Sequence, residues 1–117
     1  MGLFSFFRRR RKPERVVITE SAVTRTRSDG VEEAVQLADL NEVGILTTDE
    51  GPWQEDVYFL LIGSDGKSGC VVPQSAEGFD KLLSYLQKLP GFNNEAVIKA
   101  MGTTTNAKFV CWKRQAS

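Results

Sequence analysis

The sequence predicts one α+β domain with an antiparallel sheet of about six to seven strands, one long amphipathic C-terminal helix and a second short helix. Three observations lead to this fold class. Short apolar runs of β-type residues, separated by turn residues, fill the chain up to Pro73, and helical periodicity appears only after it. Parallel strands would need helical crossovers between them, so we expect antiparallel strands. The 117 residues are enough to bury a core without disulfides or metals.

Seven segments have the alternating or continuous apolar pattern of β-strands. In chain order they are residues 15–19, 22–27, 31–37, 43–47, 57–62, 69–72 and 108–113. The segment 57–62 is the clearest, because its six consecutive apolar residues leave no polar face. We therefore expect a central strand that is covered on both faces. Turn residues at 64–67 connect it to the segment 69–72, which predicts a β-hairpin that ends at Pro73.

Both helices are expected after Pro73. Ser75 is a candidate N-cap for the long helix, and Pro90-Gly91 ends it. The apolar residues of this helix recur at helical spacing, with charged and polar residues between them. They are Phe79, Leu82, Leu83, Leu86 and Leu89. The short helix is predicted over residues 94–101 and is closed by Gly102.

Charge is distributed unevenly along the chain, although its total is zero. Residues 1–15 contain six basic residues and one acidic residue, whereas the other 102 residues contain nine basic and fourteen acidic ones. We expect residues 1–15 to be a flexible tail and residues 16–117 to be the domain. The candidate tail residues for binding a membrane or another anionic surface are Leu3, Phe4, Phe6, Phe7, Arg8, Arg9, Arg10, Arg11 and Lys12.

An apolar cluster beside a basic block is typical of segments that dock peripherally on anionic membranes. Each basic residue near such a surface contributes about 1 kcal/mol. Three other interpretations of the tail remain open: a disordered segment that aids solubility, a docking element for a protein partner, and a nucleic-acid-binding segment. We do not favour nucleic acid as the partner, because the acidic body does not continue the basic surface.

The segment 49–56 places four carboxylates around Trp53 and is a candidate partner-recognition loop, because tryptophan is a favoured anchor of interface hot spots. The carboxylates belong to Asp49, Glu50, Glu55 and Asp56. The same group could instead bind a hard cation, perform glycosidase-type acid–base catalysis, or form an ordinary solvated turn. Its spacing does not match an EF-hand loop, so we predict no metal and no cofactor.

The residue types exclude several kinds of chemistry. The chain has no histidine, so it has no Ser-His-Asp or Cys-His catalytic pair and no His-ligated zinc. Cys70 and Cys111 are far apart, and we expect both to be reduced core thiols of a cytoplasmic protein. No apolar stretch reaches the length of a transmembrane helix, and the tail has the reverse order of a signal peptide.

Residues 31–45 resemble a motif of small bacterial pleckstrin-homology-like domains. The motif consists of polar–apolar alternation with an Asp-Leu step at residues 39–40. In that family a strand pair turns at such a step, and a β-hairpin and an amphipathic helix follow, as expected here for residues 16–89. The resemblance implies a partly closed sheet or barrel that serves as a binding module. Members that bind phosphoinositides have basic residues at the first strand turn, where this chain has Glu20-Ser21, so the resemblance implies no particular ligand.

Three functional hypotheses follow. The first is a non-enzymatic interaction or adapter module that is attached by its tail to the inner face of the membrane and binds a protein partner. The second is an immunity-type or inhibitory protein that covers a basic effector with its acidic surface. The third is a hydrolase that uses the carboxylates of segment 49–56. We favour the first hypothesis.

Overall fold

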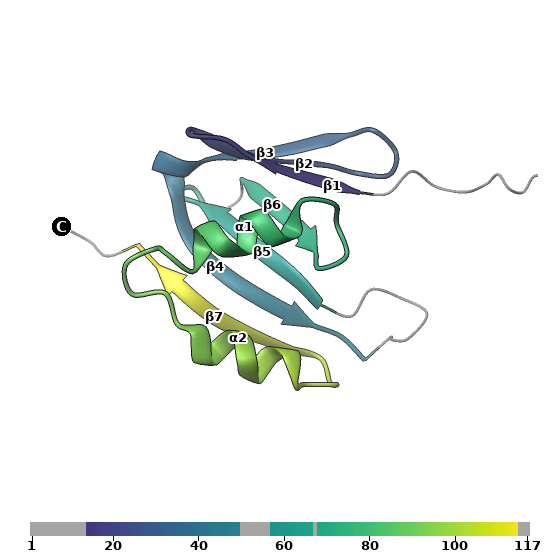
Figure 1. Ribbon diagram of the computed structural model, residues 1–117, viewed down its shortest axis with the longest axis vertical. Helices are drawn as coiled ribbons and strands as arrows, with labels where there is room; N and C mark the ends of the chain where they lie inside the picture. The colour runs from purple at the N-terminus through teal and green to yellow at the C-terminus, as the bar shows by residue number, and fades with distance from the viewer. Residues whose placement is uncertain (1–13, 50–56, 67, 115–117) are drawn as a thin grey trace, which may run out of the picture.

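The computed structural model describes residues 14–49, 57–66 and 68–114, and these residues form an α+β fold (Figure 1). The strands are β1 (Arg15–Ile18), β2 (Ala22–Thr26), β3 (Glu32–Gln36), β4 (Leu40–Thr47), β5 (Val57–Gly63), β6 (Gly69–Pro73) and β7 (Ala107–Lys113). The helices are the 3-10 helix η1 (Leu37–Asp39) and the α-helices α1 (Phe79–Leu86) and α2 (Asn94–Met101). Every predicted strand is present, and the main difference is that β4 begins at Leu40, earlier than predicted.

The strands are antiparallel, as predicted, but the described residues form two sheets that do not close into one barrel. One sheet has the order β1-β2-β3, and the other has the order β6-β5-β4-β7. The separation occurs at η1, which turns the chain between β3 and β4, so that β4 pairs with β5 and β7. The prediction of a partly closed sheet or barrel is therefore wrong for the described residues.

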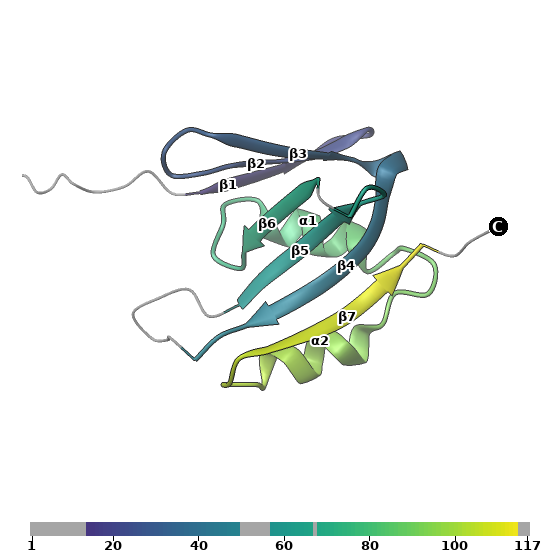
Figure 2. The ribbon, with the colours of Figure 1, turned by 180° about the vertical axis from the view of Figure 1, so that it is seen from behind.

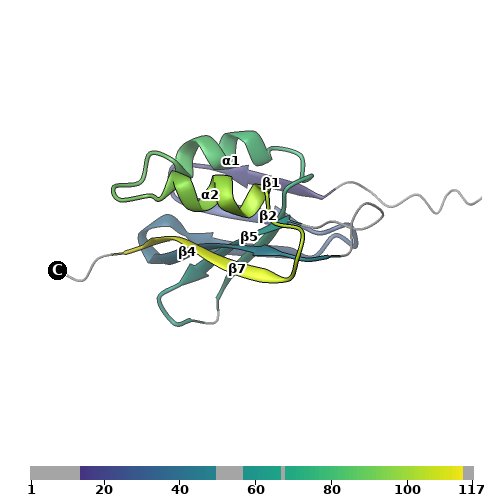
Figure 3. The same ribbon diagram turned by 90° about the horizontal axis from the view of Figure 1, so that it is seen from below.

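The elements enclose one core. Both α-helices lie on the same face of the four-stranded sheet (Figure 3), while the three-stranded sheet contacts β6 and α1 beside them. In the centre, the rings of Phe59 and Phe79 meet edge to face with their centroids 4.9 Å apart. Leu61, Leu82 and Leu86 are almost fully buried around them. The burial of these large side chains is the main stabilising contribution to such a fold.

β5 is a central strand, as predicted, but only one of its faces is fully covered. Val57, Phe59 and Leu61 are buried under the helices, whereas Tyr58, Leu60 and Ile62 on the opposite face are partly exposed. Viewed from behind, that face of the four-stranded sheet has no described element over it (Figure 2). The continuous apolar run therefore does not mean burial on both faces, which corrects the prediction.

α1 is shorter than the long helix predicted from Ser75, and its N-cap is Gly78. The reason is a competing interaction. The backbone N–H of Val16 donates to the Glu77 carbonyl at 2.8 Å, and the N–H of Glu77 donates to the Glu14 carbonyl at 2.8 Å. These bonds form a parallel bridge between β1 and Glu77, which holds Glu77 out of the helix, so the helix begins only at Phe79.

α2 has the predicted bounds, Asn94–Met101. Its N-cap is Asn93, whose side-chain oxygen accepts a hydrogen bond from the N–H of Ala96 at 3.1 Å. This is the capping pattern that polar residues provide at helix starts. Gly102 is the C-cap, as predicted, and α2 buries Val97 and Ala100. The helix contacts β7 and β4.

A β-bulge in β7 turns a large aromatic side chain into the core. Val43 pairs with Trp112, but the next residue of β4, Gly44, pairs with Val110, so Cys111 is an extra residue in β7. A bulge of this kind breaks the alternation of side-chain directions. As a result, Cys111 and Trp112 are both buried although they are adjacent in sequence.

An ion-pair cluster joins the two sheets. Arg25 contacts Glu14 at 2.6 Å and Glu33 at 3.0 Å, and its side chain is only 12% exposed. Glu33 also accepts a hydrogen bond from the backbone N–H of Val71 in β6 at 3.3 Å. Burial alone would lower the pKa of the Arg25 guanidinium, but the hydrogen bonds and charges of the two glutamates raise it above its ordinary value. Arg25 is therefore engaged within the fold.

Candidate functional site

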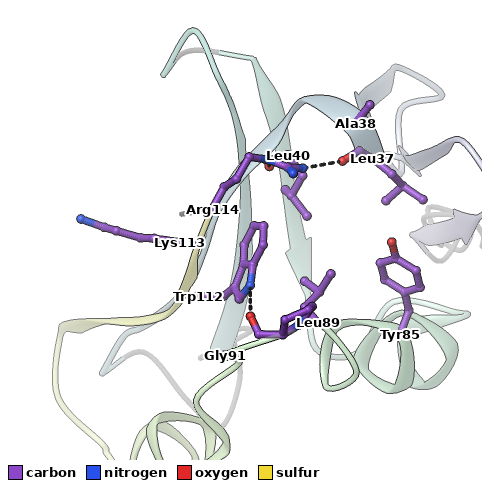
Figure 4. A pocket seen from close by; sticks show the side chains of 10 residues that line it. Leu37, Ala38, Leu40, Tyr85, Leu89, Gly91, Trp112, Lys113 and Arg114 are labelled. Atoms are coloured by element: carbon purple, nitrogen blue, oxygen red, sulfur yellow. Dashed lines mark hydrogen bonds between the residues drawn. The ribbon is translucent and has the colours of Figure 1, made fainter. Parts of the chain in front are cut away.

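A groove of about 660 Å³ lies where η1, the end of α1 and the end of β7 meet (Figure 4). Its walls come from three segments that are far apart in the sequence. The lining residues are Leu37, Ala38, Leu40, Tyr85, Leu89, Pro90, Gly91, Trp112, Lys113 and Arg114. Ligand pockets in proteins usually measure about 300–1,000 Å³. The groove therefore has room for more than one side chain of a bound molecule.

Trp112 forms one wall of this groove, and its ring is held in place. The side chain is 8% exposed, and its indole N–H donates to the carbonyl of Pro90 at 2.8 Å. The bulge in β7 directs the ring to this side of the sheet, and the Pro90-Gly91 turn supplies the acceptor. A buried tryptophan whose N–H has a partner offers a rigid aromatic surface.

Arg114 is fixed above this aromatic wall. Its Nε donates to the carbonyl of Leu40 at 2.8 Å, and one Nη donates to the carbonyl of Leu37 at 3.1 Å. The guanidinium carbon lies 5.6 Å from the centroid of the Trp112 ring, which is a cation–π distance. A guanidinium has five N–H donors, and the remaining ones have no acceptor among the described residues. They are available to an anion in or beside the groove.

Tyr85 and Lys113 complete the polar part of the site. Tyr85 is partly buried in α1, and its ring points into the groove with the hydroxyl toward η1 (Figure 4). The hydroxyl has no hydrogen-bond partner in the described part of the chain. Lys113 points away from the groove, so it contributes charge at the rim and no direct contact inside. The groove thus combines apolar walls with one fixed cation and one free hydroxyl.

The electrostatic character of the groove differs from that of the rest of the domain. The body of the chain has an excess of acidic residues, but among the described residues the only charged ones that line the groove are Lys113 and Arg114. Nearby Asp39 does not line the groove, and its carboxylate accepts a hydrogen bond from the Ser64 hydroxyl. The groove is therefore suited to a ligand that combines an apolar side chain with a negative charge.

The candidate membrane-binding residues of the tail, Leu3 to Lys12, lie outside the described residues. The chain enters the described fold at Glu14 and Arg15. Arg15 pairs with Glu77 at 3.0 Å, although both side chains are well exposed. In the part of the chain that the structure describes, neither α-helix has the length or apolar character needed to cross a bilayer.

Of the candidate partner-binding residues, Trp53, Glu50, Glu55 and Asp56 also lie outside the described residues. Asp49 is described and exposed, and its backbone N–H donates to the Asn106 side chain at 3.2 Å. It follows the end of β4, whereas Leu40 at the start of β4 lines the groove. Asp49 and the groove are therefore at opposite ends of the same strand.

Cys70 and Cys111 are free and buried, as predicted. Burial raises the pKa of each thiol to about 11. The Cys70 thiol lies 3.4 Å from the carbonyl oxygen of Glu33 and 3.6 Å from that of Val23, so it can donate to either. Neither cysteine lines the groove. Among the described residues, no cluster of three or more acidic residues or cysteines could hold a metal ion.

The groove residues were missed by reasoning from the sequence. Trp112 and Lys113 were interpreted only as the end of the predicted strand 108–113, and Arg114 was given no role. The sequence could have indicated a binding site here, because an aromatic residue is followed directly by two basic residues. No sequence pattern indicated that Tyr85 and Leu37 line the same groove, because only the fold brings them close to Trp112.

Comparisons with models of protein families, with curated proteins and with solved structures found no match to this chain. The resemblance of residues 31–45 to pleckstrin-homology-like domains therefore stays a prediction.

Proposed function

We propose that this chain is a non-enzymatic interaction module that binds an acidic, apolar segment of a partner protein in the Trp112 groove. The observation that carries the proposal is the Arg114 guanidinium, which is held over the Trp112 ring with donors left for a ligand. Arginine and tryptophan are the residues most often found at interface hot spots. A fixed side chain loses little conformational freedom on binding, which favours affinity.

The lining of the groove supports a peptide ligand of this chemistry. Leu37 and Leu89, which are partly exposed, offer apolar contacts for a leucine or phenylalanine of the partner, and the buried Leu40 supports them. A carboxylate next to that side chain would reach the free donors of Arg114, and bonds between a guanidinium and a carboxylate are stronger than neutral ones. The Tyr85 hydroxyl would provide a second donor. The pleckstrin-homology-like resemblance, which also implies a binding module, agrees with this proposal.

A titration with a designed peptide tests the groove. The probe is a short peptide of Leu, Phe, Asp and Glu, and its control has Lys in place of each acidic residue. Binding of the acidic peptide should shift the NMR signal of the Trp112 indole N–H, and the lysine peptide should leave it unchanged. Arg114→Gln should weaken binding about tenfold or more, since a charge-assisted hydrogen bond is lost.

Lys88→Gln is the matched control, because Lys88 is an exposed cation just after α1 that does not line the groove. It should change the affinity by less than about twofold, since an exposed charge outside the site contributes little. Equal affinity for the two peptides, or equal effects of Arg114→Gln and Lys88→Gln, would show that the groove does not recognise acidic segments.

We also propose that residues 1–15 attach the module peripherally to an anionic membrane surface. The support is the sequence of the tail, in which an apolar cluster precedes a basic block. The test is a deletion of the tail, and the structure shows which residues can be removed without disturbing the fold. Glu14 pairs with Arg25, and Arg15 pairs with Glu77, so a deletion of residues 1–15 would disturb the fold. The test therefore removes residues 1–12.

The measurement is co-sedimentation with vesicles of anionic phospholipid and with vesicles of zwitterionic phospholipid. The full chain should sediment with the anionic vesicles only, and the chain without residues 1–12 should remain in the supernatant. A variant with Ser in place of Arg8, Arg9, Arg10, Arg11 and Lys12 separates charge from apolar insertion. If deletion leaves sedimentation unchanged, the tail is not the attachment site.

A further inference from the structure

The outer face of the four-stranded sheet has no described element over it (Figure 2), and it is largely apolar apart from charged residues toward β7, among them the Glu42–Lys108 ion pair. Three of its large apolar residues are substantially exposed: Leu46 by 36%, Val71 by 41% and Val110 by 44%. The alternate residues of β5 lie between them and are partly exposed. An apolar surface that extends over four adjacent strands is unusual for an isolated protein and indicates an interaction surface. We propose that this face binds the same face of a second copy of the chain.

The arrangement of residues on the face supports a copy of itself as the partner. Strand pairing places Val110, Gly44, Leu60 and Val71 side by side in one row across the sheet. Gly44 has no side chain, and the Lys108 side chain covers its place in the row: the Lys108 Cε lies 3.5 Å from where a Cβ on Gly44 would be. A twofold axis along the strands would exchange β4 with β5 and β7 with β6. Leu60 of each copy would then pack on the apolar stem of Lys108 that covers Gly44 of the other, and Val110 would face Val71.

The β7 edge of this face is positive. Lys108 is paired with Glu42 at 3.4 Å, so these two charges compensate each other. Lys113 pairs with Glu42 in the register of β4 and β7 and therefore points to the same face. Among the described residues Lys113 has no ion-pair partner. This edge thus has one uncompensated positive charge.

The β6 edge is negative. Glu33 lies beside Val71, where it accepts a hydrogen bond from the backbone N–H, and it lines a hollow together with Leu60. Arg25 is shared between Glu33 and Glu14, so the cluster has one uncompensated negative charge. The twofold arrangement brings the β7 edge of each copy to the β6 edge of the other. Opposite charges would therefore meet on both sides of the interface.

The size of the face determines the expected strength of association. Four strands about 4.8 Å apart, with three rows of side chains, cover roughly 20 by 20 Å. The buried area of the pair is then on the order of 1,000 Å², at the small end of specific interfaces. We expect a dimer with a dissociation constant in the micromolar range or weaker. This surface shares only Lys113, at the rim, with the described lining of the Trp112 groove, so the inference does not depend on the proposed function.

The test is the mass of the full chain by sedimentation equilibrium over a range from about 10 µM to about 1 mM, where weak dimers form. We expect a monomer–dimer equilibrium. Val110→Glu should weaken it at least tenfold, and Val71→Lys should do the same, because each variant buries a charge against an apolar side chain. The double variant should recover most of the association, since the introduced charges have opposite signs and face each other across the axis.

Ile98→Glu is the control for a general loss of apolar surface. Ile98 is 72% exposed, but it lies on α2, away from the outer face of the sheet. This variant should associate like the unchanged chain. Thermal unfolding of each variant shows whether the fold is retained. A monomer at every concentration, an equal effect of Ile98→Glu and Val110→Glu, or no recovery in the double variant would overturn the proposal.

Discussion

Gly78 lies directly against the backbone of Val16. Its φ is +90°, and a Cβ atom at this position would collide with the Val16 carbonyl oxygen. The close approach results from the bridge between β1 and Glu77, which holds the start of α1 beside the first strand. One glycine therefore connects the three-stranded sheet to the helix that covers the core.

Gly78→Ala should destabilise the protein by about 2 kcal/mol or more, because a side chain at positive φ is strained and the added methyl group also meets the backbone. Gly91→Ala is the matched control, since Gly91 has a φ of +82° and no atom lies near a Cβ built there. It should cost about 1 kcal/mol from the backbone conformation alone. Urea unfolding measures both free energies, and equal losses would show that the contact with Val16 is unimportant.

Arg25→Ala should lower the free energy of unfolding by about 2 kcal/mol, because it leaves two partly buried glutamates close together without their shared cation. Arg27→Ala is its control. Arg27 pairs with Asp29 at 3.0 Å, but both side chains are exposed, by 44% and 51%. Exposed pairs contribute about 0–1 kcal/mol, so this variant should change little. Chemical denaturation at low and moderate salt checks the comparison.

Trp112→Phe should destabilise the protein by about 1–3 kcal/mol, since it removes the hydrogen bond to Pro90 and part of a buried ring. Tyr85→Phe removes a hydroxyl that has no partner among the described residues, so stability should change by less than about 0.5 kcal/mol. The two variants thus distinguish Trp112, which forms a wall of the groove, from the Tyr85 hydroxyl, which points into the groove. Comparable losses in thermal unfolding would contradict this assignment.

Stability should fall as the pH rises from about 9 to about 11. Burial raises the pKa of Cys70 and Cys111 from 9.0 to about 11, so the unfolded chain loses these protons at a lower pH than the folded chain. The folded state therefore binds more protons within this window, and its stability decreases with pH. Below pH 9 the contribution is fully present.

The double variant Cys70→Ala and Cys111→Ala isolates this effect from the titration of lysines and tyrosines. Its free energy of unfolding should decrease less steeply between about pH 8 and about pH 10.5 than that of the unchanged chain. A thiol reagent should modify the folded protein slowly and the unfolded protein quickly, because a buried protonated thiol is a poor nucleophile. Identical pH slopes would show that the thiols do not contribute.

Local patterns in the sequence were sufficient to place the strands and one helix. Alternating apolar residues marked most strands, because each has one face in the core. Asn93 and Gly102 mark the ends of α2, and both signals act within a few residues of the helix. The positive charge of the tail and the negative charge of the body follow from composition alone, so they could be read from the sequence without knowing the fold.

Contacts between segments that are distant in the sequence decided the length of α1, the direction of Trp112 and the position of the groove. The bridge from β1 to Glu77 shortened α1. No residue near Ser75 indicates in the sequence that Glu77 will pair with β1 and not join the helix. The bulge at Cys111 turned Trp112 inward, because pairing with β4 decides which residue of β7 is the extra one. The sequence by itself determined where the elements lie, since each element depends on nearby residues. The groove and the open face of the sheet exist only in the tertiary structure, because side-chain direction and exposure depend on which strands and helices pack together.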